Sequence, residues 1–390
     1  MRILISFPHS LGATGIGWSA WNQADSLIRA GHEVHVVAAS VGRPIVGAAS
    51  VTTTLSARRL RVPHRAIGRE RAFRWHDLQA RRTLARTPVD VAHLWPLGEG
   101  LTAAAARASG VAVVREAPNT HTERAWRTVG AETHRLGIVA EPTAHTPSAS
   151  HLRMERAEWA ASTAILAPSQ AVRDSFVAEG FSPERVLRHR YGYRPGTRRP
   201  RVRSADPRPL RVVYVGLGEP RKGLHHALQA WRASRASVDG TFTVIGRMLP
   251  AYSRAIASDL AQPSVRVVGF SDDVEAALAS ADALVLPTVE EGSALVTYEA
   301  QAMGCVPLVS TAAGAVIEDG VQGLLHTPGD VATLTSQFDL LASDRAVLAR
   351  LSKAALEHAS HLTWDAAAIE LLAAYQVAVQ MAGRSDAVGQ

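Results

Sequence analysis

The stretch Ala281–Ser310 constrains the fold more than any other part of this chain. Its apolar run Ala283–Leu286 is short enough for a buried parallel strand. A helical pattern follows over Ala294–Met303, Gly304 stops it, and Val306–Val309 forms a second strand. The stretch therefore predicts a strand–loop–helix–strand unit of an open α/β sheet, in which ligands bind outside the carboxyl ends of the strands.

The loop and helix start within this stretch predict a phosphate site. Free backbone N–H groups and the positive end of the helix dipole lie at such a start and suit an anion. The candidate ligand-binding residues there are Gly292, Ser293, Ala294 and Leu295. Two carboxylates frame the site, Glu291 in the loop and Glu299 eight positions on, which is about two turns at 3.6 residues per turn.

The run E-G-S-A-L-V-T-Y-E, with E-A-Q-A-M-G-C-V-P-L-V-S ending it, resembles the E-x7-E signature of retaining, GT-B-fold glycosyltransferases of family 4. The resemblance implies that Glu291 contacts the sugar of a nucleotide-sugar donor and that Glu299 holds the ribose hydroxyls. Without the resemblance, the same spacing also fits a solvated acidic loop and one exposed helix glutamate. The resemblance further implies retention of anomeric configuration, a UDP-, GDP- or similar donor, and no cofactor or metal.

A second glycine-bearing strand-to-helix turn, Gly216–Gly223, carries two cations. Lys222 is a compact point charge and Arg221 a planar fork, and both suit a diphosphate whose negative charge grows as it leaves. The turn resembles the family pattern G-R-x-x-x-x-K-G, except that Leu217 stands where the family has arginine. Arg221 then either replaces that arginine or faces solvent.

The loop Gly269–Asp273 resembles the family loop that receives the nucleobase through backbone groups, which makes Gly269 and Phe270 candidate ligand-binding residues. Capping of the next helix is the simpler role for Asp272 or Asp273. Near the N-terminus, a glycine-rich turn follows the predicted strand Ile3–Phe7. It resembles the family loop that faces the diphosphate and the acceptor, and it is a weak signal by itself.

Within that N-terminal turn the candidate residues are Gly15 and Gly17. His121 follows the predicted strand Val111–Arg115 and a Pro-Asn turn. It resembles the family's strand-end histidine, which contacts the donor sugar, and it is the second candidate catalytic residue beside Glu291. A lone histidine more often has a structural role. Glu116 and Glu123 lie near enough in sequence to orient it or to bind acceptor hydroxyls.

The length of 390 residues favours two domains rather than one core. Repeated β–α alternation implies parallel sheets covered on both faces. We expect the α/β fold class GT-B, with an acceptor-side Rossmann-like domain over residues 1–200 and a nucleotide-sugar domain over 201–365. The resemblance implies that the helix in 366–390 crosses back to the first domain.

Charge supports a boundary near residue 200. Residues 1–203 hold 29 Arg and 15 acidic residues, and the remainder holds 13 basic and 20 acidic residues. The ten arginines between Arg58 and Arg86, interleaved with Phe73, Trp75 and Leu78, fit either peripheral contact with an anionic membrane or an ordinary outer helix. Because no nucleic-acid motif accompanies the charge, we expect no nucleic-acid partner.

Other features bear on compartment. Cys305 is the single cysteine and excludes a disulfide framework. The N-terminus lacks the length and cleavage site of a signal peptide, and no stretch approaches the apolar length of a membrane span. We therefore expect a cytoplasmic protein, with peripheral contact at the inner face of the membrane as the further option.

Three alternatives to a transferase remain open at this stage. A nucleotide-sugar epimerase on the same fold would release altered donor with no acceptor added. A glycan phosphorylase would require pyridoxal phosphate on a lysine. A non-catalytic, membrane-associated component of glycan assembly would bind lipid vesicles without hydrolysing donor. The sequence identifies neither the sugar and base nor the acceptor, which could be a glycan, a lipid-linked sugar or a small molecule.

Overall fold

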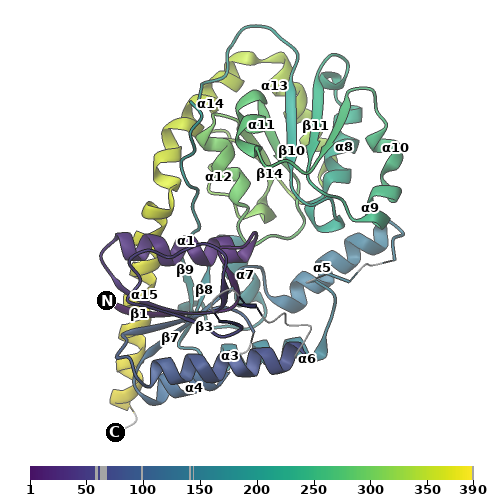
Figure 1. Ribbon diagram of the computed structural model, residues 1–390. Helices are drawn as coiled ribbons and strands as arrows, with labels where there is room; N and C mark the ends of the chain where they lie inside the picture. The colour runs from purple at the N-terminus through teal and green to yellow at the C-terminus, as the bar shows by residue number, and fades with distance from the viewer. Residues whose placement is uncertain (58–59, 62–67, 98–99, 140–141, 144, 389–390) are drawn as a thin grey trace. The chain divides into compact units, whose positions relative to one another are not determined.

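The structure, a computed structural model, describes residues 1–57, 60–61, 68–97, 100–139, 142–143 and 145–388. Contacts between residues divide the chain into two compact units. The first unit comprises Met1–Pro118, Ser148–Tyr191 and Trp364–Gln390, and the second comprises Asn119–Pro147 and Gly192–Thr363. Each unit is built around one parallel sheet (Figure 1).

The sheet of the first unit has seven strands in the order β3-β2-β1-β6-β7-β8-β9. They are β1 (Arg2–Leu11), β2 (Glu33–Val41), β3 (Ser50–Thr53), β6 (Val91–Leu94), β7 (Ala112–Glu116), β8 (Ala164–Ala167) and β9 (Val186–Arg188). Ile3 of β1 lies opposite both Val34 and Val91. A separate antiparallel pair joins β4 (Ser56–Ala57) to β5 (Leu60–Arg61). The central strands are buried almost throughout because helices cover both faces of the sheet.

The helices of the first unit form two layers. They are α1 (Ile16–Arg29), α3 (Arg69–Leu84), α4 (Gly100–Ala108), α6 (Ala149–Ala161), α7 (Gln170–Ala178) and α15 (Trp364–Val388), with the 3₁₀ turn η1 (Pro183–Arg185). Helix α15 packs with α1 and against β7 and β9, whereas α4 packs between α3 and α6 (Figure 1). The last helix of the chain therefore belongs to the core of the first unit.

Helix α15 corrects one prediction. Its segment Trp364–Arg384 is long and apolar enough, by length and composition, to cross a membrane. The expectation that no stretch approaches that length was therefore wrong. Leu371, Tyr375 and Ala378 are buried in the first unit, so packing against β7 and β9 accounts for the apolar character of the helix.

The sheet of the second unit has six parallel strands in the order β12-β11-β10-β13-β14-β15. They are β10 (Arg211–Val215), β11 (Thr241–Ile245), β12 (Val265–Gly269), β13 (Ala283–Leu286), β14 (Val306–Ser310) and β15 (Leu324–His326). The order reverses at β10, whose neighbours are β11 and β13. Such a switch point opens a crevice at the carboxyl ends of the strands.

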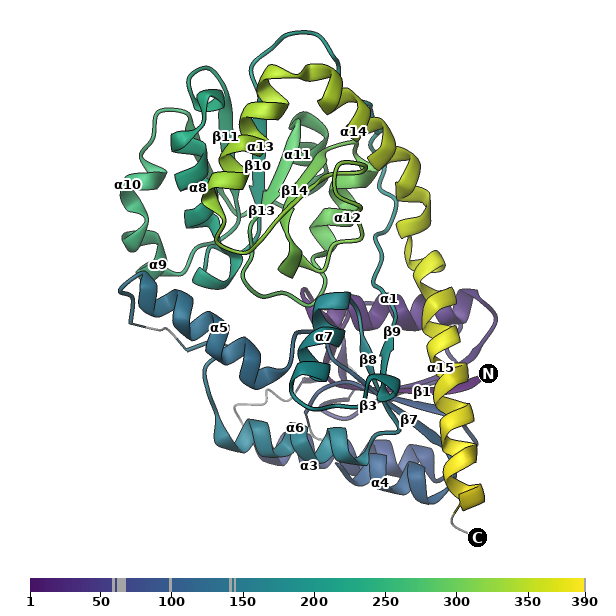
Figure 2. The same cartoon turned by 180° about the vertical axis from the view of Figure 1, so that it is seen from behind.

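The second unit is also layered. Its helices are α5 (Thr122–Arg135), α8 (Leu224–Ala233), α9 (Pro250–Ala255), α10 (Ala257–Leu260), α11 (Val274–Ser280), α12 (Leu295–Ala302), α13 (Val331–Ser343) and α14 (Arg345–Ala359). The 3₁₀ turns are η2 (Pro220–Lys222), η3 (Arg235–Ser237), η4 (Thr311–Ala313) and η5 (Ser360–Leu362). Helix α8 packs against α13, and α12 packs against α14 (Figure 2). Trp231 of α8 meets Phe338 of α13 edge to face in the core, with ring centroids 5.4 Å apart.

The α/β architecture with two Rossmann-like parallel sheets is confirmed. Within it, β13 has the predicted bounds. Strand β1 was predicted to end at Phe7 but continues to Leu11, and its register shifts between Phe7 and Ser10. The shift spans Pro8, which has no N–H to donate to a neighbouring strand. The sequence assigned no helix to the segments that form α5, α13 and α14.

The structure also bears on the predicted domain boundary and on the arginine-rich stretch. Contacts group Asn119–Pro147 with the second unit, although the sequence placed this segment in the domain 1–200. Of the arginine-rich stretch, Arg58, Arg59 and Arg65 lie outside the described residues. In α3, Phe73 is buried and Arg74 is exposed, which is the pattern of an ordinary outer helix.

Candidate functional site

The candidate site lies where β10 leads through η2 into α8. Backbone contacts fix this turn against the end of β13. The N–H of Val289 and the hydroxyl of Thr288 both donate to the carbonyl of Arg221, at 2.9 and 2.8 Å. Gly223 has φ +68°, and a Cβ there would lie 2.0 Å from the carbonyl oxygen of Pro287. Only glycine allows this left-handed turn to approach β13 so closely.

We therefore predict that Gly223→Ala destabilises the second unit by about 2–5 kcal/mol, the sum of a left-handed alanine and an overpacked contact. Gly320→Ala is the matched control, because Gly320 has φ +74° but nothing within 4 Å of the added Cβ. Thermal unfolding of the two variants separates the close approach from backbone strain. Equal losses in both would show that the contact with Pro287 carries no cost.

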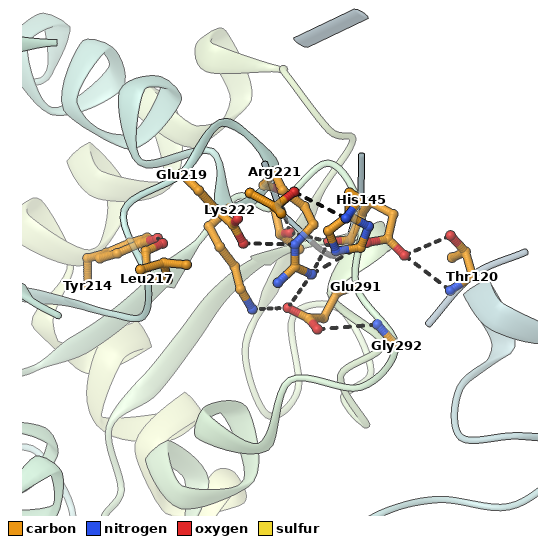
Figure 3. Close-up of polar contacts among 12 residues, drawn as sticks. Thr120, His145, Tyr214, Leu217, Glu219, Arg221, Lys222, Glu291 and Gly292 are labelled. Carbon is orange, nitrogen blue, oxygen red and sulfur yellow. Dashed lines mark hydrogen bonds and ion pairs between the residues drawn. The ribbon is translucent and has the colours of Figure 1, made fainter. Parts of the chain in front are cut away.

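The turn brings together three of the predicted site residues. The ammonium of Lys222 forms an ion pair with Oε2 of Glu291 (Figure 3). The guanidinium of Arg221 lies 3.3 Å from the same oxygen, and its Nε donates to Glu219 at 2.9 Å. The side chain of Arg221 is only 12% exposed, so the option that it faces solvent was wrong. Leu217 is half exposed, and its carbonyl accepts from Tyr214.

The surroundings of Lys222 alter its acid–base behaviour. Burial, with the neighbouring charge of Arg221, lowers the pKa of Lys222 to about 7, although Glu219 and Glu290 act in the opposite direction. At this position the nearby carboxylates are what favour the charged ammonium form of the side chain. A strong anion next to it would favour the charged form.

Glu290 is a member of this cluster that the sequence reasoning missed. One of its carboxylate oxygens accepts from the N–H and the hydroxyl of Thr120, at 3.1 and 2.7 Å, and the other lies 3.4 Å from Arg221. Burial would raise the pKa of Glu290, but Arg221 and His145 outweigh it and lower the pKa. The only available sequence signal was its position beside Glu291 in an E-E pair.

The segment after Glu291 only partly matches the predicted phosphate cradle. The N–H of Gly292 donates to Glu291 at 3.3 Å, and the hydroxyl of Ser293 lies 2.6 Å from that of Tyr298. The N–H of Ala294 donates to the carbonyl of Ala313 at 3.0 Å, so it is not available to an anion. Helix α12 begins at Leu295.

Glu299 lines a separate hollow of about 200 Å³ in the second unit. The spacing predicted that Glu299 lies about two turns into the helix. Because α12 begins at Leu295, Glu299 lies only one turn into it. Burial, with a smaller contribution from Glu275, raises the pKa of Glu299. Asp272, which belongs to the predicted nucleobase loop Gly269–Asp273, lines the same hollow.

The two residues of that loop differ in exposure. Gly269 ends β12 with φ +81°, and its carbonyl accepts from the N–H of Gly246 at 2.8 Å. Phe270 is 60% exposed, and the guanidinium of Arg247 lies 5.1 Å from the centre of its ring. Asp273 caps α11 by accepting from Ala276, as predicted.

The remaining predicted residues are divided between the units. Gly15, with φ +76°, precedes α1 in the first unit, and a Cβ on Gly17 would lie 2.5 Å from the carbonyl of Ser10. His121 is buried and immediately precedes α5 in the second unit. Glu116 does not serve it as predicted, because the buried carboxylate of Glu116 is surrounded by groups of the first unit.

Those groups are two histidines, a tyrosine and a glutamine. Oε1 of Glu116 accepts from His189 at 3.0 Å and from Tyr191 at 2.9 Å. Oε2 accepts from Gln23 at 3.3 Å and lies 3.1 Å from Nε2 of His93. Glu123 lies in the first turn of α5.

A second polar group of the second unit lies in α5 and α8. Glu132 of α5 meets His225 and His226 of α8, with their ligand atoms within 4.8 Å of one another. Glu132 lies 93 positions before His225 and 94 before His226, so local spacing in the sequence could not reveal this group.

Comparison with known proteins agrees with this architecture. Residues 209–344 match the family described as Glycosyl transferases group 1, and residues 13–188 match Glycosyltransferase Family 4. A D-inositol 3-phosphate glycosyltransferase of Stackebrandtia nassauensis is 38% identical over 102 residues, which are 25% of this chain and 23% of that protein. The MMP alpha-(1->4)-mannosyltransferase of Mycolicibacterium hassiacum is 31% identical over 182 residues, 43% of each chain.

The alignments thus span less than half the length of these two curated relatives. The crystal structure of Anabaena HepE in complex with UDP and glucose superposes with a TM-score of 0.66 at 16% identity, covering 95% of this chain and 98% of that one. This likeness concerns the fold. From the two family matches and the two parallel sheets, the chain belongs to the family 4 glycosyltransferases and has the GT-B fold.

Proposed function

We propose that this protein is a retaining, metal-independent glycosyltransferase that moves a sugar from a nucleotide-diphosphate sugar to an acceptor. The observation that carries the proposal is the convergence of Lys222, Arg221 and Glu291 at the turn before α8. Two cations and a carboxylate beside a helix start supply what a diphosphate and its attached hexose require. The family match supports a transferase as the class of enzyme.

In this proposal the donor diphosphate takes the place of Glu291 as the partner of Lys222. The ammonium and the Arg221 guanidinium then stabilise the negative charge that grows on the leaving group. Glu291, released from the ion pair, is free to accept hydrogen bonds from hexose hydroxyls. Glu290 acts as a positioning residue, because its carboxylate contacts both Arg221 and Thr120.

The nucleoside half of the donor belongs in the hollow lined by Glu299 and Asp272. A carboxylate there can accept both ribose hydroxyls. Gly269 and Phe270 lead into this hollow along the chain, and the exposed ring of Phe270 offers a face for stacking. The HepE structure, described as a complex with UDP and glucose, supports a nucleotide sugar as the donor class.

Retention fits a same-face transfer in which the leaving phosphate helps to remove the acceptor proton. Gly15, Gly17 and His121 remain the proposed acceptor-side and sugar-contacting residues. The acceptor is a sugar, a lipid-linked sugar or a small molecule. A cytoplasmic location and membrane contact through the arginine-rich segment stay predictions.

Nucleotides and nucleotide sugars tested in a thermal-shift panel identify the donor, since a ligand that binds only the native state raises its stability by mass action. Product analysis with the donor so identified then tests transfer. Release of the nucleoside diphosphate in step with formation of a glycosylated acceptor supports the proposal. An altered sugar nucleotide with no acceptor product would instead indicate an epimerase.

We predict that Glu299→Ala weakens donor binding about 10–100-fold, the loss expected when hydrogen bonds to a charged group worth about 1.5–3 kcal/mol are removed. The free nucleoside diphosphate should lose the same factor, because the residue contacts ribose and not hexose. Glu275→Ala is the matched control, since it removes a neighbouring carboxylate from the same hollow. Calorimetric titration with the nucleoside diphosphate measures both. Unchanged affinity in Glu299→Ala would exclude it from the nucleotide site.

A further inference from the structure

Two adjacent histidines of α8 and one glutamate of α5 form a buried cluster in the second unit. Nε2 of His225 lies 2.6 Å from Oε1 of Glu132, and Nε2 of His226 lies 2.9 Å from the same oxygen. All three side chains are less than 8% exposed. Nε2 of His226 makes no hydrogen bond of acceptable geometry with any described residue, despite its closeness to that oxygen. One carboxylate oxygen therefore faces two imidazole nitrogens but satisfies only one of them.

The atoms on the outer side of the cluster are held in place. Nδ1 of His225 lies 2.9 Å from the hydroxyl of Tyr252, which also accepts from the backbone N–H of His225 at 3.0 Å. Oε2 of Glu132 accepts from Arg135. In metal sites, partners of this kind fix the tautomer of a ligating imidazole and orient a ligating carboxylate. The inner atoms, Nε2 of both histidines and Oε1 of Glu132, are left to face one another.

We propose that Glu132, His225 and His226 form a binding site for a divalent transition metal, with zinc as the best fit, and that this site joins α5 to the start of α8. Two imidazoles and one carboxylate are a common zinc ligand set. The site would take water as its fourth ligand. The site contains none of the residues assigned to the diphosphate, so this proposal does not require metal in the transfer step.

The present spacing is close to that of a coordination site. Bonds of about 2.0–2.2 Å in a tetrahedron place neighbouring ligand atoms roughly 3.3–3.5 Å apart. The two N–O distances of 2.6 and 2.9 Å must therefore lengthen by less than 1 Å. Rotation of the Glu132 side chain supplies this, and its partner Arg135 is 64% exposed and can follow.

The imidazole of His225 also has a partner that borders a pocket. Tyr252, whose hydroxyl lies 2.9 Å from Nδ1 of His225, lines a pocket of about 120 Å³ together with Val129 and Thr133 of α5. Imidazole ligands favour zinc, copper, nickel and cobalt over magnesium and calcium, which prefer oxygen.

The test is metal binding by the full chain after treatment with a chelator. We expect one equivalent of Co²⁺ to give the visible absorption of a tetrahedral centre, one equivalent of Zn²⁺ to abolish that absorption, and Mg²⁺ to have no effect. Zn²⁺ at 100 times its dissociation constant should raise the melting temperature, since the ion binds only the folded state. Absence of the cobalt absorption in the wild-type chain would overturn the proposal without any variant.

Variants locate the site. His226→Ala and Glu132→Gln should each weaken Zn²⁺ binding at least 10–100-fold. His134→Ala is the matched control, because it removes an exposed histidine from the same helix. Circular dichroism of the metal-free variants establishes that they are folded. Zn²⁺ binding of wild-type strength in both cluster variants, or equal loss in His134→Ala, would place the metal elsewhere and refute the assignment.

Discussion

Lys222→Ala is expected to lower kcat/KM for sugar transfer about 10²–10³-fold, the loss that follows removal of one group that stabilises charge developing in a transition state. The lysine lies in a turn fixed by Gly223 and pairs with Glu291, so its charge is held at one position in the proposed diphosphate site. Most of the loss should appear in kcat, because the charge on the leaving diphosphate is greatest as the bond breaks. Steady-state kinetics with the donor found in the thermal-shift panel measure it.

The chain provides an unusually clean control for this variant. Lys353 is the other lysine, and its side chain is 68% exposed on α14, where it lies 3.8 Å from Glu357. Lys353→Ala should leave transfer unchanged. A second variant, Lys222→Arg, keeps the charge but not the compact shape, and should restore part of the rate. Near-wild-type turnover in Lys222→Ala would remove the lysine from the site and with it the proposed donor orientation.

The fold was largely predictable because its strands are continuous apolar runs bounded by glycine and proline. Ala283–Leu286 illustrates this, since Pro287 follows it and the structure gives the same bounds. Helix α5 was missed because its sequence is polar and follows a segment that resembled a loop. Its position is decided by contact with η2, almost a hundred residues later in the chain, and no local pattern reports such a contact.

Candidate residues that lie together in the structure could be predicted where charge and glycine occur together in one turn. Lys222 and Gly223 could be assigned from their neighbours alone, and the pairing of Lys222 with Glu291 follows from adjacent strands of one parallel sheet. The cluster around His225 could not be assigned in this way. Its carboxylate comes from Glu132, whose side chain reaches α8 only through the packing of α5.

The buried carboxylate of Glu116 carries the second large prediction. Burial alone would raise its pKa, but the charge and hydrogen bond of His189 and the hydrogen bond of His93 outweigh burial and hold the pKa well below its ordinary value of 4.5. The hydroxyl of Tyr191 donates to the same carboxylate. We expect Glu116→Gln to destabilise the first unit by about 3–5 kcal/mol. The substitution removes the negative charge of the carboxylate, while the side chains that pair with that charge stay buried.

The effect must depend on pH in a defined direction. A carboxylate whose pKa is lowered by folding stabilises the native state above its unfolded value of 4.5 and loses that contribution as the pH falls through the folded value. The difference in stability between wild type and Glu116→Gln should therefore be constant from pH 7 to 5 and narrow below pH 4.5.

Exposed Glu184 of the same unit provides the control Glu184→Gln, which should match wild type throughout. Near-ultraviolet circular dichroism during thermal unfolding follows Trp95, which is buried and stacks on His93. A difference that stays constant down to pH 3 would show that Glu116 acts through packing and not through its charge.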